Sequence, residues 1–216
     1  MDVRTENDPD VKPYIQDVKI NWIKVDFPEE FKQIHKFLKD CRDSKLLEAK
    51  KFGYCKGVGM YKGELLQLQG ELQRSLSQGL RDFELLRSVS LIAETLKVEH
   101  ALELLESQGI KQTHTYLKKI QTEAVTSKVK AVQNLAMDLN FKSALYLTEE
   151  IMEKGIKHPK LAKLQEILEK SRKDSKAIVF TQFRDSAEEI VKQLNEAGIS
   201  NHIFVGQAKK NGVGFS

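Results

Sequence analysis

The sequence predicts a mainly α-helical fold: a bundle of about five to seven helices, one strand near the N-terminus and a small, incomplete α/β portion at the C-terminus. Apolar residues recur at three- and four-residue spacing through most of residues 29–170, which is the period of an amphipathic helix. An alternating apolar run precedes them at residues 18–27, and a β-branched run follows at residues 176–181. The 40% hydrophobic content is enough for a buried core.

The N-terminal strand is expected in the run VKINWIKVDF, after a polar segment that contains Pro9 and Pro13. Because proline disfavours helix in the residue before it, regular structure should begin after this segment. The alternation slips between Trp22 and Ile23. This slip indicates either a bulge or a strand that is covered on both faces, as in a parallel sheet.

A long helix is expected directly after this strand. Asp26, Pro28 and Glu29 form a helix-start signature, in which side chains satisfy free backbone N–H groups. Four glycines between residues 53 and 63 then predict a flexible connection. Further helices are expected at residues 64–76, 80–105, 113–125, 128–135 and 141–152, and from Pro159, whose helix should direct inward Leu161, Leu164, Ile167 and Leu168.

The C-terminal part changes character. The run KAIVFT at residues 176–181 has the pattern of a buried parallel strand. Residues 184–197 indicate a helix that Gly198 ends, and residues 202–205 indicate a second short strand. This order is a βαβ unit that is begun but not finished, so we expect the chain to stop inside a domain.

Composition narrows the class of protein. The formal net charge of +4 only weakly favours an anionic partner. No run approaches the roughly 20 apolar residues of a membrane span, and the N-terminus has no signal pattern. We therefore expect a soluble, cytoplasmic protein with no membrane partner. Cys41 and Cys55 lack metal-ligand or disulfide spacing, so free thiols are expected.

Motifs for catalysis are not found. The chain has no phosphate loop of the G-x-x-x-x-G-K-[ST] type, no Asp-Glu dipeptide and no G-x-S-x-G elbow. The glycines at residues 57–63 do not match a nucleotide-binding pattern, and the five histidines lack ligand spacing, which favours surface or capping roles. We therefore expect no catalytic residue, no metal and no cofactor in this chain, which should be inactive by itself.

Positive charge is concentrated between residues 31 and 62, where nine basic residues face only three acidic ones. Cations at helical spacing can follow successive phosphates and release counterions. The interleaved aromatic residues Phe52, Tyr54 and Tyr61 could stack on unpaired bases. The alternative is a solvated basic face beside aromatics that pack inward. The lysines assigned to nucleic-acid binding are Lys32, Lys36, Lys39, Lys50, Lys51, Lys56 and Lys62.

Several segments resemble the archaeal Hef helicases and their eukaryotic relatives of the FANCM family, superfamily 2 DNA-repair helicases that act at stalled replication forks. IVFTQFRDSA at residues 178–187 resembles motif IV of their second RecA-like domain, and FVGQA at residues 204–208 resembles the next motif. HPKLAKLQEIL at residues 158–168 is similar to the helix leading into that domain. Residues 4–29 resemble the last strand of the first motor domain and the start of the insert.

By this resemblance, residues 1–28 end the first motor domain, residues 29–172 form a helical DNA-binding insert, and residues 173–216 begin the second motor domain. The resemblance also implies that the nucleic-acid backbone is touched by Thr181, Gln182, Arg184, Gly206 and Gln207. It implies ATP and Mg²⁺ as cofactors of a parent helicase. This chain lacks the nucleotide-binding motifs upstream and the arginine-finger motif downstream.

Two hypotheses follow. The insert binds forked or branched DNA through backbone charge and shape, as part of a nucleoid-associated helicase. Alternatively, the helices are a structural spacer between the motor domains, and their charge is incidental. Unpaired strand edges near residues 18, 178 and 203 further predict that the strands pair with one another or with a second copy of the chain.

Overall fold

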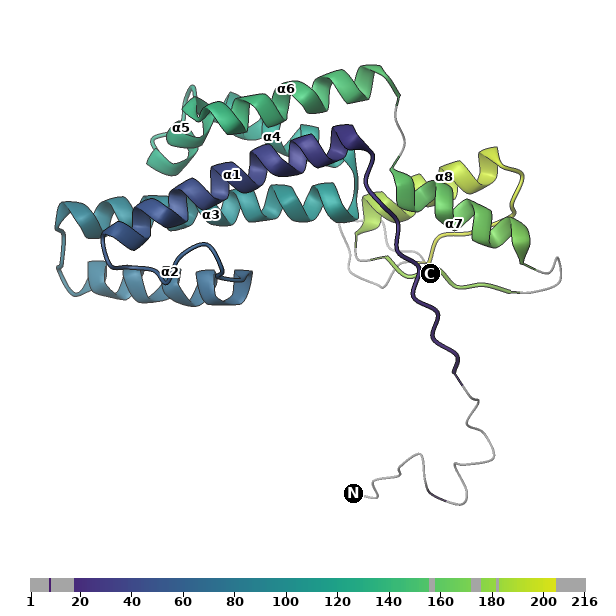
Figure 1. The fold of residues 1–216 in the computed structure, drawn as a ribbon, viewed down its shortest axis with the longest axis horizontal. Coiled ribbons are helices and arrows are strands. Elements are labelled where there is room, and N and C mark those ends of the chain that lie inside the picture. Colours follow the sequence, from purple (N-terminus) through teal and green to yellow (C-terminus); the bar gives the residue numbers. More distant parts are fainter. Residues whose placement is uncertain (1–7, 9–17, 156–157, 172–175, 182, 205–216) are drawn as a thin grey trace, which may run out of the picture.

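The computed structural model describes residue 8 and residues 18–155, 158–171, 176–181 and 183–204. These residues contain eight helices, so the mainly α-helical prediction is confirmed. The first six pack together as a bundle and the last two pack with each other, and in Figure 1 this pair lies at one end of the bundle. The helices are α1 (Glu29–Lys51), α2 (Lys62–Ser77), α3 (Phe83–Ser107), α4 (Ile110–Glu123), α5 (Lys130–Met137), α6 (Leu139–Glu153), α7 (Pro159–Lys170) and α8 (Arg184–Glu196).

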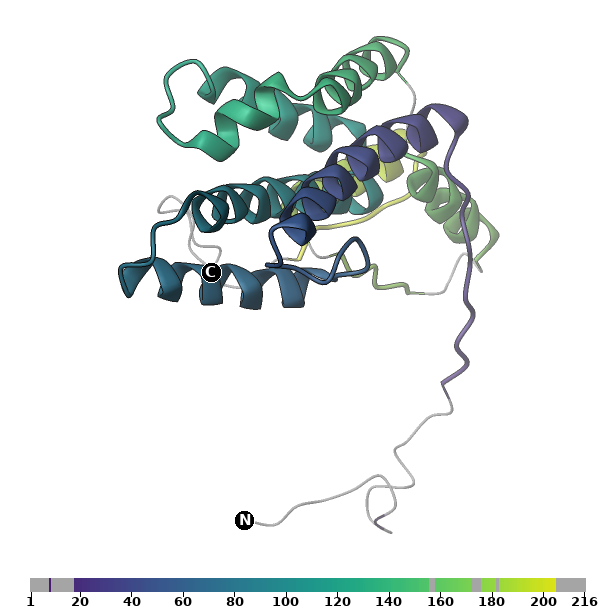
Figure 2. The same ribbon diagram turned by 60° about the vertical axis from the view of Figure 1, so that its left-hand side comes forward.

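The long helices α1 and α3 pack against each other and form the centre of the bundle. Helix α2 covers α3 on one side, and α4, α5 and α6 lie on the other side, with α6 along α1 (Figures 1 and 2). This arrangement follows from the sequence, because α1 and α3 carry buried residues along their whole lengths. Five of the predicted lysines lie on α1, whereas Lys56 lies in the loop that follows it and Lys62 is the first residue of α2.

Side chains cap the N-terminal ends of three described helices, α3, α6 and α7. Asp82 and Asp138 accept hydrogen bonds from the backbone N–H groups of Leu85 and Phe141, and so cap α3 and α6. The start of α1 differs from the prediction, because Pro28 is the residue before the helix and no side chain caps it. Asp26 is therefore not the cap that its spacing predicted.

The bundle has two apolar cores. The first contains the N-terminal half of α1, the C-terminal half of α3, and α4, α5 and α6, with Phe31 and Phe141 as its largest buried side chains. The second joins the C-terminal end of α1 to α2 and the start of α3 around Leu46, Leu65 and Leu91. The two cores meet along α1 and α3, which therefore hold the bundle together.

The chain enters and leaves the bundle at one point. The ring of His158 lies edge-on to Phe27 and Phe31, with centroids 6.0 and 5.8 Å away, and its Nδ1 accepts a hydrogen bond from the N–H of Lys160 at the start of α7. Gly109, at φ 90°, ends α3 beside this ring, and a Cβ there would come within 3.1 Å of the imidazole. We call Phe27, Phe31, Gly109 and His158 the junction.

The prediction of strands near residues 18, 176 and 202 is wrong for the residues that the structure describes. Residues 18–28, 176–181 and 202–204 run without strand hydrogen bonding, and residue 205 lies outside the described part. Most of their apolar side chains are exposed, Trp22 by 90%, Phe180 by 90% and Phe204 by 97%, whereas Phe27 packs against the first core. The physical reason is that a strand needs a neighbouring strand to pair with, and the described residues place none beside these segments.

Helix α7 also departs from the prediction. None of its residues is fully buried; Leu161, Leu164 and Leu168 are half-buried and Ile167 is exposed. Among the described helices α8 is its packing neighbour, and the side-chain amide of Gln193 donates there to that of Gln165 at 3.2 Å. Among the described residues, α8 covers too little of this apolar stripe for a core to form between the two helices.

Candidate nucleic-acid interface

Four of the predicted lysines form an exposed basic face on α1. Lys36, Lys39, Lys50 and Lys51 are exposed, and within the described part of the chain none of them makes an ion pair. At about 100° per residue, the other three lie within about 60° of Lys36 around the helix axis. At about 1.5 Å per residue they span roughly 22 Å of helix. We call these four residues the α1 basic face.

The other three predicted lysines are neutralised by carboxylates. Lys32 pairs with Glu29 at 3.3 Å, Lys56 with Glu64 at 3.6 Å, and Lys62 with Glu103 at 2.6 Å. The hydrogen bond from Lys62 is the largest cause of a lowered pKa at Glu103. These lysines are still exposed or half-exposed, but each would have to exchange a carboxylate for a phosphate.

Two further cations of the basic stretch point into the bundle. Arg42 binds Asp43 and Glu99, at 2.8 and 2.9 Å. Lys45 is 12% exposed and lies between Asp138 and Glu94. The positive excess that the sequence shows between residues 31 and 62 is therefore larger than the excess that reaches the surface.

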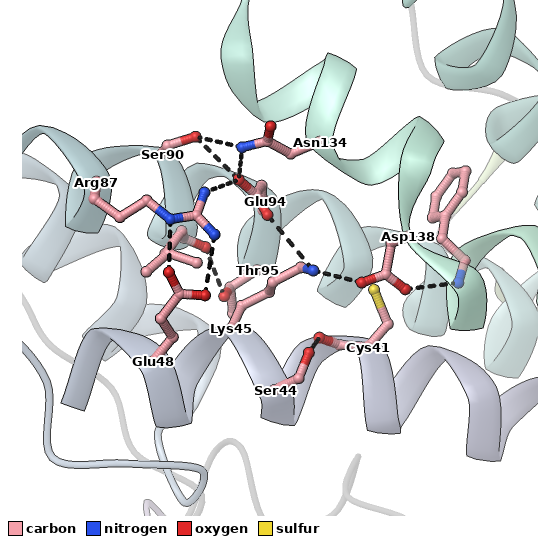
Figure 3. A network of polar contacts seen from close by, with 12 residues as sticks. Cys41, Ser44, Lys45, Glu48, Arg87, Ser90, Glu94, Thr95, Asn134 and Asp138 are labelled. Atoms are coloured by element: carbon pink, nitrogen blue, oxygen red, sulfur yellow. Dashed lines mark hydrogen bonds and ion pairs between the residues drawn. The ribbon is translucent and has the colours of Figure 1, made fainter. Parts of the chain in front are cut away.

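A buried polar network holds α1 in place between the two cores (Figure 3). Glu94 of α3 is fully buried, and its Oε1 accepts hydrogen bonds from Ser90, Arg87 and Asn134, the last at 2.7 Å. Lys45 lies 3.7 Å from the other oxygen of Glu94. A carboxylate without partners would be costly to bury, so these contacts fix α1 against α3 and α5.

The same network extends to the start of α6. Burial acts to raise the pKa of Asp138, but the hydrogen bond from Lys45 opposes it and the pKa of this carboxyl is lowered. Burial, with the Asp138 carboxylate nearby, raises the pKa of the Cys41 thiol to about 12. Cys41 is therefore an inert packing residue at neutral pH, in agreement with the free thiol that was expected.

This network is the feature that the sequence interpretation missed. A signal was present, because Glu94 occupies the same helical stripe as the buried Leu91 and Val98. A carboxylate in an apolar stripe predicts a buried partner. Lys45, Asp138 and Asn134, however, come from three other segments of the chain, and no local pattern connects them to Glu94.

The aromatic residues near the basic stretch divide into two kinds. Phe52 and Tyr54 pack against the second core, and the ring of Phe52 lies edge-on to that of Phe83 at 6.4 Å. These two side chains therefore pack inward, as the alternative interpretation of the basic stretch predicted. Tyr61 is 68% exposed and remains available for stacking.

The residues implied by the helicase resemblance lie at the other end of the molecule. Thr181 is exposed, and Arg184 in the first turn of α8 pairs with Glu188 at 3.4 Å. Gln182, Gly206 and Gln207 lie outside the described residues. Helix α8 lines a cleft of about 950 Å³ with α3 and α4, whose charged lining residues are Lys111, Lys119, Arg184, Lys192, Asp185, Glu188, Glu189 and Glu196. This mixed lining gives no clear preference for an anion.

Comparison with known proteins places the bundle in a family. A profile of the family described as "Putative ATP-dependent RNA helicase, helical bundle" matches residues 30–155, more than half of the chain. The chain belongs to this helical-bundle family of helicases. The match begins one residue after the start of α1 and ends two residues after α6, so the family bundle is the six-helix unit that carries the α1 basic face.

Longer relatives contain this helicase bundle. The chain is 37% identical over 221 residues to the "Putative ATP-dependent RNA helicase" of Methanocaldococcus jannaschii, covering 100% of this chain and 27% of the relative. It is 27% identical over 228 residues to the ATP-dependent DNA helicase mph1 of Neurospora crassa, covering 96% of this chain and 19% of the relative. The chain thus spans about a quarter or less of the length of these relatives.

The fold matches a solved helicase structure. The Hef helicase domain of Pyrococcus furiosus superimposes with a TM-score of 0.83 and 35% sequence identity, over 96% of this chain and 44% of that one. The resemblance to Hef helicases and their FANCM relatives is thereby confirmed. The division at residues 28 and 172 into motor and insert parts stays a prediction. None of the described helices is long and apolar enough to cross a membrane.

Proposed function

We propose that the helical bundle binds forked or branched DNA as the insert of an ATP-dependent DNA-repair helicase. The observation that carries this proposal is the α1 basic face, in which four exposed lysines lie along one side of a single helix and form no ion pair with any residue that the structure describes. A span of roughly 22 Å corresponds to about six base pairs, at about 3.4 Å per nucleotide of one strand. Backbone contacts of this kind give affinity without sequence preference.

The rigidity of α1 supports the same proposal. The network around Glu94 and Lys45 anchors α1 from the inside, so the four ammonium groups start from one fixed scaffold. The backbone positions that carry these lysines are therefore set before a ligand arrives, so binding has to order the side chains but not the helix. Similarity to DNA helicases such as mph1 and to the Hef helicase domain agrees with a nucleic-acid partner.

Motor activity is proposed for the parent protein alone. The chain has no phosphate loop of the G-x-x-x-x-G-K-[ST] type, which is the segment that cradles the phosphates of ATP in such motors. ATP and Mg²⁺ would be held by segments outside this chain. The contribution of the bundle would be to select the DNA structure on which the motor acts.

The proposal is tested by charge reversal with a matched control. We compare Lys36→Glu/Lys39→Glu with Lys128→Glu/Lys130→Glu, which makes the same charge change at two exposed lysines around the start of α5. Binding of a forked DNA is expected to weaken about tenfold or more in the first variant and much less in the second. Gel shifts with a fork, a four-way junction and a linear duplex provide the measurement.

The outcome also decides between the proposal and the spacer alternative. If both variants bind the fork as tightly as the unaltered chain, the α1 basic face is not the contact surface. If the unaltered chain binds none of the three DNAs in low salt, the bundle is a spacer. Equal weakening by both variants would show that only total charge matters.

A further inference from the structure

A shallow groove runs between α1 and α6, beside the α1 basic face. It has a volume of about 520 Å³ and is lined by Gln33, Phe37, Lys142, Ser143, Tyr146 and Leu147. Phe37 and Leu147 are partly buried against the first core and form an apolar floor. This volume lies in the range of pockets that bind small ligands. A stable protein–protein interface would need a much larger buried area than these six lining residues provide.

Tyr146 is the unusual residue of this groove. Its side chain is 64% exposed although the tyrosine sits in the middle of a helix that packs against α1. The described contacts give its hydroxyl no hydrogen-bond partner within the bundle. A flat aromatic ring that is open to solvent above an apolar floor is suited to stacking.

The charges around the groove select the kind of ligand. Its lining contains Lys142 and no carboxylate, and Lys142 makes no ion pair among the described residues. On α1, Lys36 lies three residues after Gln33 and therefore on the neighbouring part of the same side. Acidic residues lie about one turn away along both helices, Glu30 and Asp40 on α1 and Glu150 on α6, and none of them lines the groove. An aromatic ring next to unpaired cations fits a nucleotide, which offers a base and a phosphate.

We propose that this groove binds one unpaired nucleotide at the point where the DNA strands diverge. The base stacks on Tyr146, and the adjacent phosphates meet Lys142 on α6 and Lys36 on α1. The amide of Gln33 can donate to and accept from a base edge, but stacking itself tolerates any base. The inference rests on the proposed function, and it explains how a bundle that binds backbone charge could prefer a fork to a plain duplex.

The test uses the 216-residue chain with two DNAs of equal length, a fork with unpaired arms and a blunt duplex. Tyr146→Ala is expected to weaken fork binding about tenfold and to leave duplex binding within about twofold, because a stacked base is lost only in the fork. Tyr146→Phe keeps the ring and should bind the fork like the unaltered chain. Phe83→Ala removes an aromatic side chain that is 75% exposed and outside the groove, and should have no effect.

A fluorescent adenine analogue, 2-aminopurine, placed at the first unpaired position gives a second readout. Its emission should be quenched by the unaltered chain and by Tyr146→Phe, but not by Tyr146→Ala. Thermal melting of each variant checks that the helices are intact. If Tyr146→Ala melts early, Lys142→Gln repeats the test with Tyr146 in place. Lys142→Gln should weaken fork binding more than duplex binding.

Each remaining outcome has one meaning. If Lys36→Glu/Lys39→Glu weakens binding but Tyr146→Ala does not, the groove assignment is wrong and the proposed function stands. If Tyr146→Ala weakens fork and duplex equally, the groove does not recognise an unpaired nucleotide. If Tyr146→Ala instead converts a dimer to a monomer, the groove binds a second copy of the chain. If the unaltered chain binds neither DNA, both proposals fail together.

Discussion

The helical bundle and the segments that flank it differ in how far their apolar side chains are buried. Within the bundle, Phe31 and Phe141 are fully buried. In the flanking segments, Trp22, Phe180 and Phe204 are at least 90% exposed. Both regions are rich in apolar residues, so hydrophobicity alone does not decide which of them becomes ordered around a core.

The difference lies in where the hydrogen-bond partners come from. A helix satisfies its backbone within about one turn, so α1 and α3 form and then need only side-chain partners, which the bundle supplies. A strand must pair with another strand, and the described residues at 176–181 and 202–204 have none beside them. The bundle is therefore expected to be the stable part of the chain.

The largest expected effect separates the two regions directly. Phe141→Ala should lower the free energy of unfolding by about 3–5 kcal/mol, because it opens a cavity in the first core. Phe180→Ala removes the same ring from an exposed flanking position and should change stability by less than about 0.5 kcal/mol. Urea titrations followed by circular dichroism measure both. A similar loss in the two variants would mean that the flanks are as well packed as the bundle.

Acid should weaken the junction, where the two regions meet. Burial, with a smaller effect from Lys160, lowers the pKa of His158 from its usual 6.5 to about 4. Above pH 6.5 the imidazole is neutral in both states. As the pH falls below 6.5 the unfolded state gains a proton that the folded state refuses, so stability decreases until about pH 4.

The expected loss across this window is about 2–3 kcal/mol, from a shift of this size. His158→Asn keeps a side chain able to cap α7 but removes the titration, so its stability should vary less between pH 7 and pH 4.5. Unfolding curves at a series of pH values provide the measurement. Parallel pH profiles for the variant and the unaltered chain would contradict a buried, neutral His158.

A smaller effect is expected from the polar network between the two cores. Glu94→Gln keeps the shape of the side chain but removes the charge that faces Lys45 and Arg87, and should cost about 2 kcal/mol. Glu153→Gln makes the same change at an exposed position and should be nearly neutral. Thermal unfolding compares them. Equal melting temperatures would show that the network adds no stability.

Much of the fold could be predicted from the sequence, because helix formation depends mainly on residues that are close together in the chain. The leucine spacing, the glycine that ends α3 and the proline that opens α7 each predicted an element that forms. The strands failed because their partners are not local. That the predicted lysines bind DNA stays a prediction, although Lys36 and Lys39 are exposed and make no ion pair among the described residues. Glu29, which neutralises Lys32, lies three residues away on the same helix, so this pair could have been predicted. Glu103, which neutralises Lys62, comes from α3, and only the fold reveals that pair.

The smallest expected effect concerns association through the flanking segments. Exposed, unpaired extended segments tend to pair with other chains, so weak self-association is expected at high protein concentration. Light scattering over a concentration series measures it, and Phe180→Ser should reduce it. A strict monomer at every concentration would show that these segments do not pair between chains.

The most direct test of the account is the salt dependence of fork binding by the α1 basic face. Replacing Lys36, Lys39, Lys50 and Lys51 with Gln should reduce the slope of log K against log salt by about 3–4, since each phosphate contact contributes about 0.9. Fluorescence polarisation between low and moderate salt gives both slopes. An unchanged slope would contradict the claim that these four lysines bind DNA phosphates.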